Sequence, residues 1–96
     1  MLEGLKVIKR VPDRYIGGAI WISGTYKNYF WQAEIFSVGS RYGINKGRVS
    51  RLWIKDNKTS EWVYNFDRGL DVRPKNKDVT KLKNYIVSHS LEIRGK

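Results

Sequence analysis

The chain has 96 residues, the size of one domain, because cores of fewer than about 50 residues rarely hold together without disulfides or metals. It contains no cysteine, which excludes a disulfide framework and a thiolate metal site and is typical of a reducing compartment. Nineteen Lys and Arg residues against nine Asp and Glu residues give a net charge of +10, which favours a polyanionic partner, above all nucleic acid. Many small Lys-rich proteins are basic only for solubility, so charge alone does not identify a partner.

The composition also limits the environments in which the protein can be expected to fold and act. An apolar share of 41% and an aromatic share of 14% are enough to fill one core and argue against disorder throughout the chain. No segment approaches the roughly 18 consecutive apolar residues of a membrane-spanning helix, and the start of the chain has no long apolar run. We therefore expect a soluble protein that does not contact membranes and stays in the cytoplasm.

Four segments rich in β-branched and aromatic residues predict strands of an antiparallel sheet. These segments are residues 19–26, 29–37, 48–55 and 61–66. A hairpin turn at Lys27-Asn28 separates the first two. Residues 5–8 are a candidate for a fifth strand, and residues 67–74 form either a connector or an irregular strand.

A helix is predicted over residues 76–90, where Asn76 can cap the N-terminus and Asp78 lies favourably in the first turn. Apolar residues recur at spacings of three and four, namely Val79, Leu82, Ile86 and, with them, His89. One stripe of this helix should pack on the sheet. The expected fold is α+β, with a four- or five-stranded antiparallel sheet followed by one C-terminal helix on one face. The chain would form a single domain over 1–96, with an N-terminal segment (1–17), the sheet (18–74) and the helix (76–90).

The period-two pattern of residues 48–55 separates two faces of one strand. The apolar face should hold Ser50, Leu52 and Ile54. The basic and aromatic face should hold Val49, Arg51, Trp53 and Lys55. In the next strand, we expect Trp62, Tyr64 and Phe66 to face the core.

The sequence contains few residues that indicate a catalytic site. His89 is the only histidine and lies on the apolar stripe, so neither a usual zinc site nor a histidine-dependent triad can be assembled. Asp67 and Asp71 are flanked by arginines, which favours a local ion-pair network over paired catalytic carboxylates. The glycines of residues 39–47 match no phosphate-binding motif and are better explained as turn formers. We expect a non-enzymatic protein with no cofactor and no metal.

The candidate site is the basic and aromatic strand face, extended by cations of the loop at 38–47. The residues expected to bind nucleic acid are Arg41, Lys46, Arg48, Arg51, Trp53 and Lys55. The residues expected to anchor a protein partner are Phe30, Tyr42 and Trp53. Phe30 and Gln32 would join the face if the second and third strands are neighbours. In the alternative reading, Trp53 is covered as ordinary core and the arginines are merely solvated.

The segments GINKGRVSRLWI at 43–54 and NFDRGLDVRP at 65–74 carry a resemblance to a known group of proteins. The chain resembles an uncharacterised family of small proteins from phages and mobile elements of low-GC Gram-positive bacteria, over roughly Trp21 to Ile86. The resemblance implies a bacterial host cell and no catalytic residues. The order of four strands and a helix also looks like the single-strand-binding fold of transcriptional coactivators, whose diagnostic residues are not evident here.

Two functions follow as hypotheses. The first is binding of single-stranded DNA or RNA through the basic and aromatic face. The second, by analogy with other small phage proteins, is inhibition of a host protein or defence system, such as an anti-CRISPR activity, through protein or nucleotide binding. An open edge strand could also drive homodimerisation.

Overall fold

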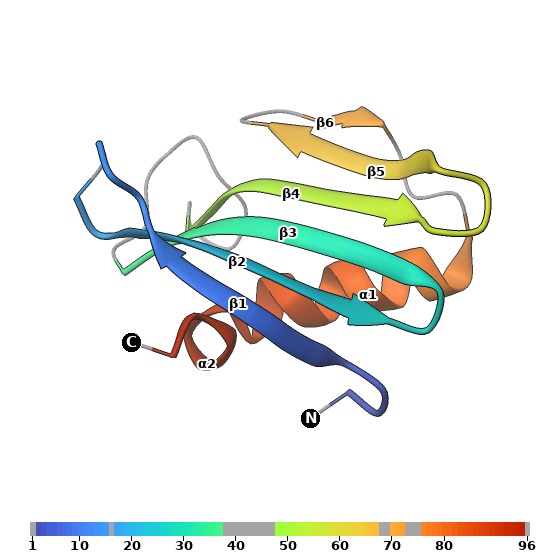
Figure 1. The fold of residues 1–96 in the computed structure, drawn as a ribbon, viewed down its shortest axis with the longest axis horizontal. Helices are drawn as coiled ribbons and strands as arrows, with labels where there is room; N and C mark the ends of the chain where they lie inside the picture. The colour runs from blue at the N-terminus through green and yellow to red at the C-terminus, as the bar shows by residue number, and fades with distance from the viewer. Residues whose placement is uncertain (1, 16, 38–47, 68–69, 73–75, 96) are drawn as a thin grey trace.

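The computed structural model describes residues 2–15, 17–37, 48–67, 70–72 and 76–95. Six antiparallel strands form one sheet whose spatial order follows the chain, and both helices pack on the same face of it (Figure 1). The strands are β1 (Lys6–Pro12), β2 (Ala19–Tyr26), β3 (Tyr29–Phe36), β4 (Val49–Asp56), β5 (Glu61–Asp67) and β6 (Leu70–Val72). The helices are α1 (Lys77–Ser88) and α2 (Ser90–Arg94). The predicted α+β fold, an antiparallel sheet followed by a C-terminal helix, is confirmed.

The sheet is a meander because each long strand is joined to the next without a crossover. Strands β2 and β3 pair from Tyr26↔Tyr29 outward, and Lys27 in the two-residue turn takes a φ of 54°. The predicted Lys27-Asn28 hairpin is therefore confirmed. The segment 5–8 extends into β1, and the connector after β5 contains the three-residue β6, so the sheet has more strands than the sequence pattern predicts.

Helix α1 supplies one side of the core. Its side chains Val79, Leu82 and Ile86 have no exposed surface, as expected from their spacing. On the sheet, fully buried side chains face them, namely Ile22, Trp31, Ala33, Ile35, Leu52 and Ile54. Asn76 caps α1, because its Oδ1 accepts a hydrogen bond from the Val79 amide at 2.9 Å, as predicted.

Two register shifts change which side chains face this core. Between β3 and β4, Val49 pairs with Ile35 and is fully buried, whereas the Ser50 hydroxyl donates to Glu34 at 2.7 Å. The predicted faces of Val49 and Ser50 are therefore wrong. Between β4 and β5, Lys55 pairs with Trp62, so that Trp62 lies on the face away from the helices and is 47% exposed. The prediction that Trp62 faces the core is wrong as well.

The helical region ends differently from the single helix expected. Helix α1 stops at Ser88, and His89 occupies the break, where its ring stacks on Tyr85 with centroids 4.1 Å apart. The short helix α2 then returns to the sheet, because Arg10 Nε donates to the Ile93 carbonyl at 2.9 Å and Arg94 donates to the Gly18 carbonyl at 3.0 Å. In the part of the chain that the structure describes, neither helix has the length and hydropathy needed to cross a bilayer.

Candidate functional site

The face of the sheet opposite the helices is here called the open face, since no described element packs over it (Figure 1). Strand pairing places on it Lys6, Lys9, Val11, Trp21, Ser23, Thr25, Phe30, Gln32, Glu34, Arg51, Trp53, Lys55, Trp62, Asn65 and Asp67. The set combines rings, cations and hydrogen-bonding groups on one surface. It is therefore the surface on which a ligand can meet several strands at once.

Three indoles form a cluster across the open face, the tryptophan cluster of Trp21, Trp53 and Trp62. The Trp21 and Trp53 ring centroids lie 5.4 Å apart at 38°, and those of Trp53 and Trp62 lie 6.4 Å apart at 71°. Such tilted and edge-to-face contacts are favoured by ring quadrupoles. Trp53 is half-buried between its neighbours, and Trp62 is the most exposed of the three. The alternative in which Trp53 is enclosed in the core is wrong.

The structure brings together several of the predicted site residues. Arg51, Trp53 and Lys55 share the open face, as their alternation predicts. Phe30 pairs with Lys55 and Gln32 pairs with Trp53, because β3 and β4 are neighbours. The expected extension of the face onto β3 is thereby confirmed.

Other predicted residues are not brought to this face. Arg48 lines a small cavity with residues 88–92, at the break between α1 and α2, and its buried Nε has no hydrogen-bond partner among the described residues. The structure therefore does not bring Arg48 to the face that carries Arg51 and Trp53. Arg41, Tyr42 and Lys46 lie outside the described residues.

The cations of the open face differ in how much charge they offer a ligand. Arg51 is compensated, since its Nε donates to Asp67 Oδ1 at 3.0 Å and its Nη1 lies 4.0 Å from Glu34 Oε1. Among the described residues, Lys6, Lys9 and Lys55 of the open face make no ion pair, and Lys6 pairs with Thr25, at the end of β2 away from Trp21. The Lys55 ammonium lies 6.0 Å from the centroid of the Trp62 ring, within reach of a cation–π contact. Lys9 and Lys55 are therefore the cations best placed to meet a phosphate.

A buried carboxyl group lies beneath the cluster. Glu34 is 1% exposed, and burial raises its pKa, while the hydrogen bond from Ser50 lowers it and the one shared with Asp13 raises it again. Asp13 in turn accepts a hydrogen bond from Trp21 Nε1 at 3.1 Å. A hydrogen bond between two carboxyl groups needs a proton on one of them, which fits the direction of the Glu34 pKa.

This network predicts how stability depends on pH. The folded protein binds the Glu34 proton more tightly than the unfolded chain, in which the pKa of a Glu side chain is near 4.5. The stabilisation from this group is therefore complete below that pH and is lost as pH rises through the raised folded pKa. Glu34→Gln mimics the protonated acid without titrating. We expect it to be more stable than the wild type at pH 7, with a difference that grows from pH 4.5 upward.

Urea midpoints of both proteins across this range measure the effect, because the titrations of carboxyl groups that do not interact with Glu34 cancel in the difference. Glu61→Gln is the matched control, since it removes an exposed carboxylate at the start of β5 by the same change of side chain. A difference that stays constant with pH would show that Glu34 does not hold the proton.

Sequence reasoning missed three residues on which the candidate site depends, namely Trp21, Lys9 and Trp62. Trp21 alternates with Ser23 and Thr25, which is a signal that it lies on a polar face. Lys9 belongs to β1, whose sequence pattern is weak. No sequence signal reveals Trp62, because the register shift that turns it outward depends on pairing with β4. Within the described ranges, no three His, Asp or Glu side chains come together as metal ligands.

Comparison with known proteins places the chain in a family without indicating an activity. No curated protein and no solved structure matches it. A family model described as "Domain of unknown function (DUF7678)" matches residues 20–90. The match runs from the second residue of β2 to the first residue of α2 and thus includes Trp21, Trp53, Trp62 and Lys55, whereas β1 lies before it. Since the matched residues make up well over half of the chain, the protein belongs to the DUF7678 family.

Proposed function

We propose that the protein binds single-stranded nucleic acid, DNA or RNA, on the open face and catalyses no reaction. The observation that carries this proposal is the tryptophan cluster flanked by Lys9 and Lys55, two cations without carboxylate partners among the described residues. Proteins that bind single strands stack bases on exposed rings and track the phosphates with cations. The net charge of +10 adds a long-range attraction.

The geometry favours a single strand over a duplex. Trp21 and Trp62 lie three strands apart, on β2 and β5, which corresponds to about 14 Å at the usual spacing of strands. This span suits a short run of nucleotides whose bases turn toward the sheet. In a duplex the bases are already stacked and paired, so the indoles could reach only the backbone.

The proposal is tested by fluorescence anisotropy with labelled single-stranded DNA, RNA and double-stranded DNA. We expect single strands to bind more tightly than duplexes, and affinity to fall steeply between about 50 and about 200 mM salt as counterions return to the phosphates. Absence of binding to any single strand at the lower salt concentration would refute the proposal.

The cations give a second prediction. Lys55→Ala should weaken binding and lower the slope of log affinity against log salt concentration by about 0.7, the value for one phosphate contact on a single strand. Lys81→Ala is the matched control, because Lys81 is exposed on α1, on the other side of the sheet. Both slopes come from anisotropy titrations at several salt concentrations. Equal slopes for the two variants would show that phosphates do not lie along β4.

A protein partner in a phage-infected bacterial host is the second candidate. It is favoured by exposed apolar side chains at the β1 side of the sheet, since Ile8 is 66% exposed and Tyr15 is 87% exposed. A pull-down from nuclease-treated host lysate separates the candidates. A stoichiometric protein that survives nuclease favours inhibition of a host system, whereas loss of all partners favours nucleic acid.

A further inference from the structure

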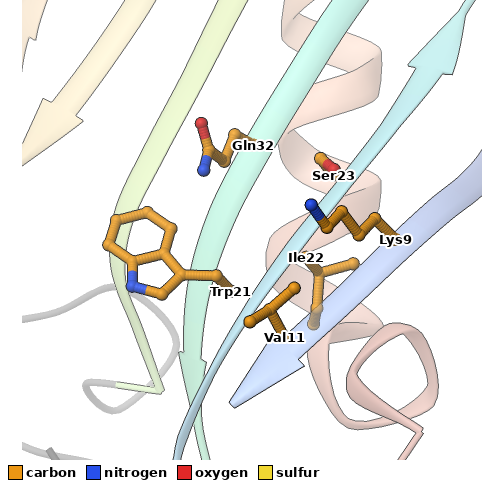
Figure 2. Close-up of a pocket in the computed structure, with 6 residues that line it drawn as sticks. All are labelled: Lys9, Val11, Trp21, Ile22, Ser23 and Gln32. Atoms are coloured by element: carbon orange, nitrogen blue, oxygen red, sulfur yellow. The ribbon is translucent and has the colours of Figure 1, made fainter. Parts of the chain in front are cut away.

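A cavity opens on the open face beside the tryptophan cluster, between β1, β2 and β3 (Figure 2). Its volume is about 280 Å³, and its lining residues are Lys9, Val11, Trp21, Ile22, Ser23 and Gln32. Pockets for small molecules begin at roughly 300 Å³, so this cavity suits one heterocyclic ring system and not a longer stretch of ligand.

One part of the cavity is apolar and held in place. The indole of Trp21 is fixed by its hydrogen bond to Asp13 Oδ2 at 3.1 Å and by the neighbouring ring of Trp53. Val11 pairs with Trp21 across β1 and β2 and is 42% exposed. A planar base can therefore stack on a ring that is already oriented, which lowers the entropy cost of binding.

The polar groups of the cavity come from three adjacent strands. Figure 2 shows the Lys9 side chain extending from β1 past Ser23, with the Gln32 carboxamide beyond it on β3. An ammonium only donates hydrogen bonds, whereas a hydroxyl and a carboxamide both donate and accept them. Donors thus outnumber acceptors, which favours a ligand edge that is rich in acceptors.

We infer that this cavity receives one guanine of the bound strand, an inference that rests on the proposed function. Guanine presents two adjacent acceptors, O6 and N7, which suit a Lys ammonium such as that of Lys9. Its ring N–H and amino group can donate hydrogen bonds to the Gln32 carboxamide oxygen. Adenine places an amino donor where Lys9 needs an acceptor, and a pyrimidine covers less of the Trp21 ring.

The test compares a short labelled oligo(dT) with the same oligonucleotide carrying guanine, adenine or cytosine at one central position. The guanine-containing strand should bind the full-length protein about 5- to about 150-fold more tightly than oligo(dT), the range expected of a paired base contact. Gln32→Leu keeps the size of the side chain but removes its hydrogen bonds. It should reduce this preference, taken as the ratio of guanine-strand affinity to oligo(dT) affinity of the same variant, to within about twofold.

Thr25→Val is the matched control, because Thr25 is a half-buried polar residue of the open face outside the cavity, and it should keep the preference. Retained oligo(dT) binding also shows that each variant folds. Equal affinity for all four strands, a preference for another base, or a guanine preference that survives in Gln32→Leu would overturn the inference and leave the proposed function standing. Failure of the wild type to bind any strand would instead overturn both.

Discussion

Replacing Trp62 by Ala should weaken binding of single strands by about 5- to about 150-fold, since one stacked base contributes roughly 1 to 3 kcal/mol. Trp62 is the most exposed ring of the tryptophan cluster, at 47%, so a base can reach it directly from solvent. Its loss also removes the ring beside which the Lys55 ammonium lies. The measurement is an anisotropy titration at constant salt.

The fold should tolerate this change because Trp62 lies on the face of the sheet away from both described helices. The control is Leu91→Ala, since Leu91 is a similarly exposed apolar residue, at 48%, on α2 and on the opposite side of the sheet. It should leave affinity within about twofold of the wild type, as expected for surface changes outside a contact. Equal affinities of the Trp62 and Leu91 variants would place the strand elsewhere.

Gly24→Ala should destabilise the protein by about 3 kcal/mol or more, at the upper end of overpacking effects. A Cβ at Gly24 would lie 1.9 Å from the carbonyl oxygen of Lys6 and 2.7 Å from the Trp31 ring. The first neighbour is backbone, so no rotamer change relieves the contact and β1 must separate from β2. The second is a core ring with no exposed surface.

Thermal unfolding measures this effect as a loss of about 12 °C or more, because one kcal/mol corresponds to roughly 4 to 8 °C in a domain of this size. Gly17→Ala is the matched control, since a Cβ there meets no atom of the described residues within 4 Å, and its melting temperature should change little. Since β1 carries Lys9 and Val11, any folded Gly24→Ala protein should also lose the guanine preference. An unchanged melting temperature would contradict the close packing of β1 on β2.

How far the sequence predicts the site depends on how local each signal is. Arg51, Trp53 and Lys55 alternate along one uninterrupted strand, and this pattern was sufficient to place them on one face. Trp62 follows the same kind of pattern, yet it lies on the face opposite to the predicted one. The cause is a register shift between β4 and β5. A register shift arises from the pairing of two strands, so the sequence of neither strand alone shows it.

Arg48 and Arg51 show a similar limit for charge. Both looked like phosphate-binding cations, but Arg48 lies at the helix break and Arg51 is bound to Asp67 at 3.0 Å. Lys9, in a segment with only a weak strand pattern, shares the cavity with Trp21 and Gln32. The ion-pair partners of a charged side chain depend on which strands become neighbours in the sheet. The sequence pattern of one strand therefore does not reveal them.

The sequence by itself determined the α+β class, the first hairpin, the cap of α1 at Asn76 and the apolar stripe that covers the sheet. These features depend on period, turn chemistry and capping, which act over a few residues. Only the tertiary structure decided that Trp21, Trp53 and Trp62 form one cluster above a buried Glu34, and that β1 completes the cavity beside it. Cross-strand register and burial set these contacts, because both depend on which strands lie side by side.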